Sequence, residues 1–313
     1  MKSESRTGLT LAALLLLAGA CGSLVRLSLG ALQPSDAAWP WMTMAINLTG
    51  AALLGCLTAY MAALGPDVGR WRTVRLALGT GLIGGYTTYS TFMLEAAQRL
   101  LAGSTGVAVG YLAASIVPGT LCALLGLALG GKLGRWRAGR VVAAFPGDSG
   151  RSSSAQERSP DHRPLLRVAV PLVAVVAVIA LAADAGHWRG QAVALLLLAS
   201  LCGGCGAFLR YLVDARVNAR VRLPLPCGTI VVNVTACLLM GLVAGWCGAH
   251  AGMETPRYLL ASGLLGGYST FSTASLESAR LAAKRRPALL VAHTLGMAVA
   301  GLAAVMAGLL VWH

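Results

Sequence analysis

Charged side chains are scarce in this sequence: they make up 12% of the 313 residues, whereas 57% are hydrophobic and the mean hydropathy is +0.72. A soluble domain carries about twice that share of charge. The shortage excludes a pair of soluble domains and predicts a polytopic membrane protein, whose surroundings are the lipid bilayer. A net charge of +14 would indicate nucleic-acid binding in a soluble protein. Here the arginines gather in short loops between apolar segments, so no nucleic-acid partner is predicted.

The features that an enzyme needs are also missing. The five histidines are scattered without the spacing of a metal site, and no nucleophile–base pair stands out. A Gly-x-Gly-x-x-Gly pattern begins at Gly79, but it lies inside an apolar segment, whereas a dinucleotide site follows a soluble strand. Most of the cysteines also lie in apolar segments, which favours small packing residues over disulfides. We therefore predict that the protein is not an enzyme and holds no organic cofactor.

Nine apolar segments are long enough to cross a bilayer, because about 20 helical residues span roughly 30 Å of hydrocarbon. They are residues 8–30, 40–64, 74–99, 105–131, 166–184, 190–213, 226–249, 257–280 and 288–311. The predicted fold is therefore an all-α polytopic membrane protein. Residues 1–131 and 190–313 hold four spans each and form two repeats. Residues 132–189 between them are interpreted as a polar cytoplasmic linker followed by one connector transmembrane helix, 166–184.

Basic residues alternate between the loops that join these spans. Every second loop is basic. Loop two contains Arg70, Arg72 and Arg75, and loop four contains Lys132, Arg135, Arg137 and Arg140. Loop six contains Arg216, Arg220 and Arg222, and loop eight contains Lys284, Arg285 and Arg286. The other loops carry at most one basic residue near a span boundary. Because cytoplasmic loops are enriched in Lys and Arg, this alternation predicts a plasma-membrane protein with its N-terminus in the cytoplasm and its C-terminus outside the cell.

One string of residues occurs twice. Residues 81–96 read GLIGGYTTYSTFMLEA and residues 263–278 read GLLGGYSTFSTASLES, which are identical at 10 of 16 positions. Other pairs keep the same order: Arg26 matches Arg210 at the end of a first span, and Asn47 matches Asn233 in a second span. The single connector span makes the second half start from the opposite side of the membrane. The repeats are therefore inverted, which is typical of transport folds with a site at mid-membrane.

Adjacent glycines inside a span can interrupt the helix and release its carbonyl groups, and neighbouring hydroxyls can then line a polar path. Two such breaks, related by a pseudo-twofold axis, would direct carbonyls from both copies at one place and form a cation site without an acidic ligand. The hydroxyls, the two Asn amides and the edges of the intervening rings would suit an anion. The alternative is a glycine-packed membrane scaffold that transports nothing, with its hydroxyls bonded to the preceding helical turn.

The string GGYTTYSTF, beginning at Gly84, resembles the signature of the fluoride channel family (Fluc, also called CrcB), which carries a Gly-Gly-x-Thr-Thr-Phe-Ser-Thr-Phe pattern in its third helix. The arginine at the end of the first helix and the Asn of the second also match, and the likeness covers both four-helix halves. Members of that family form antiparallel dimers with two pores. The resemblance therefore implies such a dimer fused into one chain and active as a monomer. It also implies a passive, fluoride-selective channel that exports fluoride from the cytoplasm.

The same resemblance implies a structural sodium ion at the centre, held by backbone carbonyl groups of the first Gly and the first Thr of each motif. These residues are Gly84, Thr87, Gly266 and Ser269. It further implies that a hydroxyl track and two Asn amides line the pores. These residues are Ser90, Thr91, Ser272, Thr273, Asn47 and Asn233.

The ring positions of the motif depart from the family pattern in the second half. In the family, each pore takes one ring from each subunit. One pore would then hold Phe271 opposite Phe92, and the other would hold Tyr89 opposite Ala274, where a ring is missing. We therefore predict that the Phe271/Phe92 pore conducts and that the Tyr89/Ala274 pore is impaired.

Two further pairs of polar residues match between the halves. Tyr111 corresponds to a polar pore-lining position of the family, and His293 stands at the same place in the second half. We interpret His293 as a packed polar residue, with a pH sensor as the alternative. Glu95 and Glu277 lie near the ends of their spans, which favours a structural role over proton coupling. An inverted-repeat transporter of another small solute stays as an alternative function, but the first, second, sixth and seventh spans hold no acid for proton exchange.

Overall fold

The computed structural model describes residues 2–144 and 190–312, and within these ranges all regular structure is helical. Six of the described helices are long and apolar enough to cross a membrane. They are α1 (Lys2–Gly30), α2 (Trp41–Leu64), α6 (Thr105–Ala144), α8 (Gly190–Arg220), α9 (Cys227–Ala249) and α13 (Pro287–Leu310). Residues 132–144 of the predicted linker continue α6. The predicted connector, 166–184, lies outside the described residues.

The two remaining predicted spans are interrupted helices. The first consists of α3 (Gly69–Arg75), the π-helix η1 (Leu76–Ile83), α4 (Gly84–Tyr86) and, after a break, α5 (Ser90–Leu101). The second consists of α10 (Glu254–Arg257), the π-helix η2 (Tyr258–Leu265), α11 (Gly266–Tyr268) and, after a break, α12 (Phe271–Ala283). Both breaks fall within the repeated string. Each break is thus preceded by a π-helix and one short α-helical turn. Within helices, π-turns are often found near functional sites.

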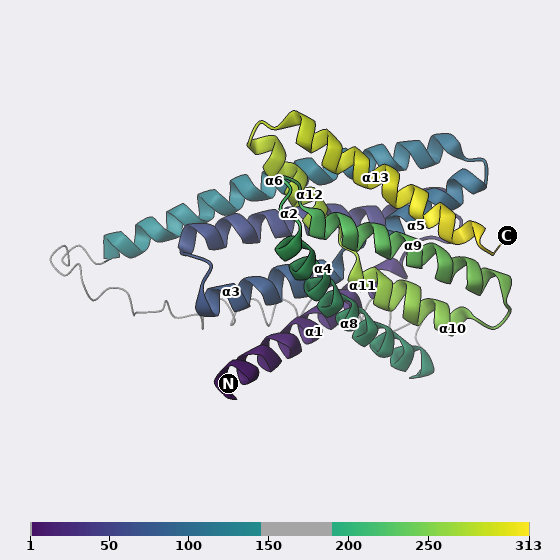
Figure 1. Cartoon of the computed structure of the whole chain (residues 1–313), viewed down its shortest axis with the longest axis horizontal. Helices are drawn as coiled ribbons and strands as arrows, with labels where there is room; N and C mark the ends of the chain where they lie inside the picture. The colour runs from purple at the N-terminus through teal and green to yellow at the C-terminus, as the bar shows by residue number, and fades with distance from the viewer. Residues whose placement is uncertain (1, 145–189, 313) are drawn as a thin grey trace.

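The two halves run in opposite directions. In Figure 1, α6 ends at the same end of the molecule as the N-terminus, whereas its counterpart α13 ends at the opposite end, beside the C-terminus. α1 packs against α8 in the middle. The short helix that follows each break lies against the other half: α5 packs against α9 and α13, and α12 packs against α2 and α6. Each half therefore completes the helix bundle of the other.

Glycine allows the first helix of each half to approach the neighbouring π-helix. A Cβ atom on Gly22 of α1 would overlap the carbonyl oxygen of Leu82 in η1, and a Cβ atom on Gly206 of α8 would overlap that of Leu264 in η2. Small residues at such contacts are how helices pack closely in a membrane, where no hydrophobic force drives apolar helices together.

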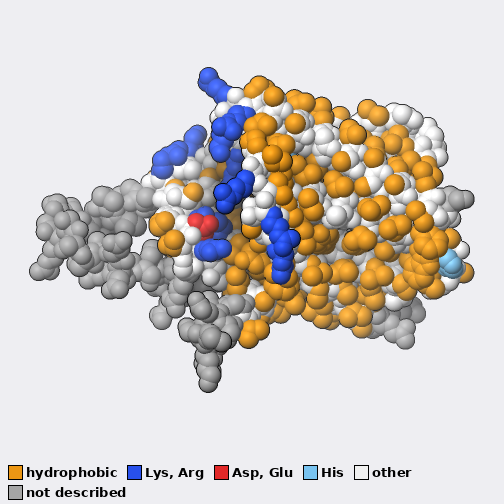
Figure 2. Space-filling view, viewed as in Figure 1, with side chains coloured by type: hydrophobic (Ala, Val, Ile, Leu, Met, Phe, Trp, Pro, Cys, Tyr) orange, Lys and Arg blue, Asp and Glu red, His pale blue; other side chains and the backbone are white. Residues whose placement is uncertain are grey.

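Basic side chains gather at one end of the surface. Figure 2 shows Lys and Arg side chains concentrated at the end where α1 begins, beside a broad hydrophobic surface. The long helices carry exposed apolar side chains such as Leu125 on α6 and Val299 on α13, which are 63% and 69% exposed. An apolar belt next to a basic end is the surface expected of a protein that sits in a bilayer.

Candidate functional site

The two helix breaks meet in the interior and cap each other's helices. The hydroxyl oxygen of Ser269 accepts hydrogen bonds from the backbone N–H groups of Tyr89 and Ser90, both at 3.1 Å, where α5 begins. The hydroxyl oxygen of Thr87 accepts one from the N–H group of Ser272, at 3.3 Å, where α12 begins. The first N–H groups of a helix have no partner within it. Each half therefore adds caps to the helix of the other half, beside the local caps that Thr88 and Thr270 give to Thr91 and Thr273. Residues 87–90 and 269–272 are called the crossing below.

Hydroxyl–hydroxyl contacts join the same residues. The Thr87 and Ser272 hydroxyl oxygens are 2.9 Å apart, and those of Ser269 and Ser90 are also 2.9 Å apart. All four side chains are buried. The predicted track residues Ser90 and Ser272 thus lie inside the crossing and contribute to its cohesion.

Asn47 and Asn233 hold the breaks from the side. The side-chain oxygen of Asn47 accepts from the N–H group of Thr88 at 3.0 Å, and its NH₂ group donates to the carbonyl oxygen of Thr88 at 2.9 Å. Asn233 makes the same two bonds to Thr270, at 2.9 and 3.0 Å. Both side chains are completely buried. The structure therefore places these two predicted pore residues on the backbone of the breaks, where they replace the hydrogen bonds that a continuous helix would make.

Two of the four carbonyl groups predicted as sodium ligands lose their helical partners as a result. In a continuous helix the carbonyl of Gly84 would accept from the N–H of Thr88, but that N–H donates to Asn47. The carbonyl of Gly266 loses the N–H of Thr270 to Asn233 in the same way.

The other two predicted carbonyls, those of Thr87 and Ser269, follow extended backbone. Thr87 has φ −98° and ψ 153°, and Ser269 has φ −78° and ψ 162°. An extended residue turns its carbonyl out of the helical ladder. The donor set thus consists of four neutral oxygen atoms released from helices, which is chemistry that suits a hard monovalent cation.

Two buried arginines reach from one half to the other. Arg26, which is 5% exposed, donates to the carbonyl of Gly85 in its own half at 3.1 Å and to that of Ser262 in the other half at 2.8 Å. Arg210 donates across the halves to the carbonyl of Thr80. Buried charges are expensive inside a membrane and usually mark functional positions. Here they bind the halves together and set positive charge beside the crossing.

A cavity of about 120 Å³, lined by both apolar and polar side chains, opens beside Arg210. The polar side chains that line it are Thr80, Arg210, Asp214, Thr229, Thr270 and Thr273. The predicted track residue Thr273 therefore faces this cavity, away from Ser272. Its counterpart Thr91 is half-buried and accepts a hydrogen bond from the hydroxyl of Thr88 at 3.0 Å. Hydroxyls together with a guanidinium can replace part of the hydration shell of a small anion.

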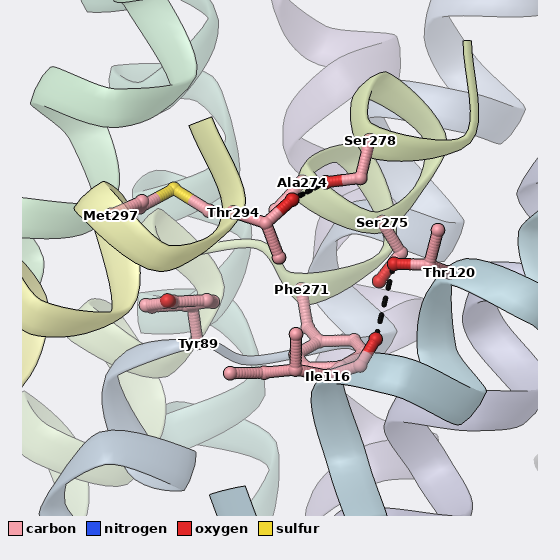
Figure 3. A pocket seen from close by; sticks show the side chains of 9 residues that line it. All are labelled: Tyr89, Ile116, Thr120, Phe271, Ala274, Ser275, Ser278, Thr294 and Met297. Carbon is pink, nitrogen blue, oxygen red and sulfur yellow. Dashed lines mark hydrogen bonds between the residues drawn. The ribbon is translucent and has the colours of Figure 1, made fainter. Parts of the chain in front are cut away.

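Four buried rings form a continuous cluster, which consists of Tyr89, Phe92, Tyr111 and Phe271. Phe92 meets Phe271 edge to face, with centroids 5.6 Å apart and planes at 89°. Phe92 also meets Tyr111 at 5.1 Å and 72°. The structure therefore brings together the rings that were predicted to share one pore. The other predicted pair, Tyr89 and Ala274, lines one small cavity (Figure 3).

Ser115 was not singled out in the sequence. It lies one turn after Tyr111 on α6, and its buried hydroxyl makes no hydrogen bond within the described part of the chain. In the second half Met297 stands at this place, with its sulfur 3.5 Å from the side-chain nitrogen of Asn233. The sequence does contain a signal for Ser115: the spacing of Tyr111, Ser115 and Gly119 puts all three on one helix face.

The two buried glutamates differ in their partners. Glu95 accepts hydrogen bonds from the hydroxyls of Thr43 and Tyr111, both at 2.7 Å. Glu277 accepts from Thr229 at 2.9 Å, but its other oxygen is 3.7 Å from Nε2 of His293. Neither that oxygen nor either ring nitrogen of His293 makes a hydrogen bond among the described residues. The second half therefore lacks the donor that Tyr111 supplies in the first.

Substitution of the matched residues Tyr111 and His293 should change the stability of the protein in opposite directions. Tyr111→Phe removes a donor from a buried carboxylate and is expected to lower the free energy of unfolding by about 1–3 kcal/mol. His293→Tyr gives Glu277 the phenol that Glu95 has and should raise it by about 1 kcal/mol. Thermal unfolding in detergent measures both. An unchanged unfolding temperature for Tyr111→Phe would mean that the hydrogen bond from Tyr111 to Glu95 contributes nothing to stability.

Comparison with known proteins places the motif in a family. A family model described as "CrcB-like protein, Camphor Resistance (CrcB)" matches residues 13–127 and 197–309, so each match contains one helix break. The fluoride-specific ion channel FluC 2 of Cutibacterium acnes is 44% identical over 117 residues, which cover 36% of this chain and 94% of that protein. The fluoride-specific ion channel FluC of Novosphingobium aromaticivorans is 36% identical over 125 residues, covering 39% and 96%. No solved structure was found to match.

The relatives therefore have the length of one half of this chain, and the family model matches both halves. These two matches together cover well over half of the sequence and confirm the resemblance carried by GGYTTYSTF. The chain belongs to the CrcB family, as a tandem of two repeats.

Proposed function

We propose that this chain is a passive, fluoride-selective ion channel of the plasma membrane that exports fluoride from the cytoplasm. Its named relatives are fluoride-specific ion channels, and CrcB proteins are ion channels and not enzymes. The observation that carries the proposal is the crossing, in which two inverted broken helices cap each other. Irregular backbone at membrane depth occurs where it is buried in protein or lines a path.

In the proposed transport, protein groups replace the water molecules that surround the fluoride ion. Fluoride is small and strongly hydrated, so a path for it has to offer hydroxyls, N–H groups and ring edges in place of water. Arg26 and Arg210 offset part of the cost of bringing an anion into a low-dielectric interior. A potential that is negative inside favours anion exit by about 2.3 kcal/mol per charge per 100 mV. We take the basic end of the molecule as the cytoplasmic end, and the N-terminus then lies in the cytoplasm.

A structural sodium ion is part of the proposal. The carbonyl groups of Gly84, Thr87, Gly266 and Ser269 would hold it, because these oxygens have left the helical ladder and no acidic ligand is needed. When bound, the sodium ion would supply positive charge that attracts the carbonyl groups of both breaks. Since one chain provides both members of every contact at the crossing, we propose that the active unit is a monomer.

The two sides of the ring cluster are proposed to differ in conduction. The side that contains Phe92 and Phe271 has both rings, the phenol of Tyr111 and the hydroxyl of Ser115, which has no hydrogen-bond partner among the described residues. The opposite side has Ala274 in place of a ring and Met297 in place of the serine. We therefore assign conduction to the Phe271/Phe92 pore and regard the Tyr89/Ala274 pore as impaired.

Fluoride efflux from liposomes that contain the purified protein tests the function. A fluoride electrode should record rapid release of fluoride, and a chloride electrode should record none above that of protein-free liposomes. If well-folded protein releases neither ion, the motif serves packing, and the glycine-packed scaffold becomes the better account. Release of both ions at similar rates would favour a transporter or channel of broader specificity.

Substitution of single rings tests the assignment of the pores. Phe92→Leu removes a ring edge worth about 1 kcal/mol and should slow fluoride efflux about fivefold. Tyr89→Leu, the matched change three residues earlier, should slow efflux less than Phe92→Leu does, because Tyr89 is assigned to the impaired side even though its ring contacts both Phe92 and Phe271. Gel filtration controls for folding. The opposite pattern, with Tyr89→Leu inactive and Phe92→Leu active, would reverse the assignment.

Removal of sodium should destabilise the protein independently of transport. A ligand that binds only the folded state adds about 2.7 kcal/mol at a concentration one hundred times its dissociation constant. The unfolding temperature should therefore be higher in sodium chloride than in N-methylglucamine chloride of equal ionic strength. Equal unfolding temperatures in the two salts would argue against a structural sodium ion.

A further inference from the structure

The ends of α8 and α12, with the loops that follow them, carry a group of exposed basic side chains. These residues are Arg216, Arg220, Arg222, Lys284, Arg285 and Arg286, and they are called the basic rim below. Both loops lie at the basic end of the molecule (Figure 2). No Asp or Glu occurs in residues 215–226 or 278–287. Within the described part of the chain, no side chain of the basic rim makes a hydrogen bond or an ion pair, so its positive charge is open to a partner.

Hydrogen bonds hold the helices that carry the basic rim together. The side-chain oxygen of Asn218 on α8 accepts from the backbone N–H group of Gly228, near the start of α9, at 3.0 Å. The next residue, Thr229, donates to Glu277 on α12 at 2.9 Å. Asp214, the other acid near the rim, accepts from Asn218 at 3.0 Å. These bonds join α8, α9 and α12 at one end and give both nearby acids partners inside the protein.

Arg285 has a backbone conformation that arginine rarely adopts. Its φ is +54°, and it is the only non-glycine residue with a positive φ in the described part of the chain. The repeated strings begin at residues 81 and 263, so the equivalent place in the first half is Gly103, with φ +75°. Glycine adopts this conformation without strain. Lys284 and Arg286 already make the loop basic enough to orient the chain, so the strain indicates a role for Arg285 itself.

Exposed apolar side chains within the basic rim indicate which partner fits. Val221 and Leu223 alternate with Arg220 and Arg222, and they are 39% and 61% exposed. They lie directly after the membrane span Ala192–Arg220, where the apolar belt meets the basic end. A nucleic acid or an acidic protein would use the charge and leave these apolar side chains in water. A membrane surface uses both, because its phosphates attract arginine and its acyl chains accept apolar groups.

We propose that the basic rim binds anionic phospholipid headgroups. Arg220, Arg222 and Arg285 donate to the headgroup phosphates, which match the planar guanidinium group. Leu223 enters the boundary between headgroups and acyl chains. The equivalent loops of the first half, residues 31–40 and 102–104, contain no Lys or Arg, so they offer no such surface. The inference rests on the proposed orientation only for the choice of leaflet, which is the cytoplasmic one, and it does not depend on the transported ion.

The unfolding temperature of the purified full chain in mixed micelles tests the surface. Phosphatidylglycerol is compared with phosphatidylcholine at equal content, because only the first has a net negative headgroup. The wild type should unfold at a higher temperature with phosphatidylglycerol, and sodium chloride should reduce this difference by screening. The triple variant Arg220→Gln, Arg222→Gln, Arg285→Gly should need roughly 100-fold more phosphatidylglycerol for the same shift, at about fivefold per basic residue.

Two single variants separate lipid binding from folding and from general charge effects. Arg285→Gly copies Gly103, so it should raise the unfolding temperature in phosphatidylcholine while it needs about fivefold more phosphatidylglycerol for the same shift. Arg257→Gln is the matched control, because Arg257 is an exposed arginine on α10, beyond the opposite end of α9. It should keep the full effect of phosphatidylglycerol.

Four results would overturn the proposal. The first is an equal unfolding temperature of the wild type in the two lipids, and the second is a full phosphatidylglycerol effect in the triple variant. The third is an equal loss in Arg257→Gln and the triple variant, which would make the effect one of net charge. The fourth is a full shift with inorganic phosphate in phosphatidylcholine micelles, which would mean that the rim binds free phosphate and not lipid. Failure of the proposed function would appear separately, as absence of fluoride efflux from wild-type liposomes.

Discussion

The reciprocal capping of α5 by Ser269 and of α12 by Thr87 is the interaction on which the rest of the structure depends. A broken helix inside a membrane exposes N–H and C=O groups that lipid cannot satisfy. Each half solves this problem for the other half, with Asn47 and Asn233 holding the remaining backbone groups. Because the N–H groups of Tyr89, Ser90 and Ser272 bond to hydroxyls of the opposite half, separating the repeats would leave them without these partners, and fusion in one chain keeps the repeats together.

Fusion also frees the two sides to diverge. In a dimer of identical subunits, a substitution alters both pores at once. In this chain Phe92 and Ala274, Ser115 and Met297, Tyr111 and His293 stand at equivalent places and differ. The first side keeps an apolar core around Phe92, whereas the second has a small cavity beside Ala274. One side is thus proposed to conduct and the other to be impaired.

Sequence patterns predicted the long spans because hydrophobicity over about 20 residues is a local property. The paired strings also located the breaks, since one residue separates Gly85 from Thr87 and one separates Gly267 from Ser269, where the breaks begin. The family followed from the same strings. The Phe92–Phe271 partnership was inferred from the family pattern, and the rings do meet. The bonding of Ser90 and Ser272 could not be read from the string, because their partners lie in the opposite half.

From the amino-acid sequence we predicted an all-helical membrane protein with two repeats, a glycine-hydroxyl string in each, and basic loops that alternate with loops of low charge. These properties depend on composition and spacing along the chain. The folded arrangement alone shows that Asn47 and Asn233 bind the backbone of the breaks and that Arg26 and Arg210 reach across the halves. Each of these contacts joins residues far apart in the sequence, so the packing of the helices, and no local signal, selects the partner.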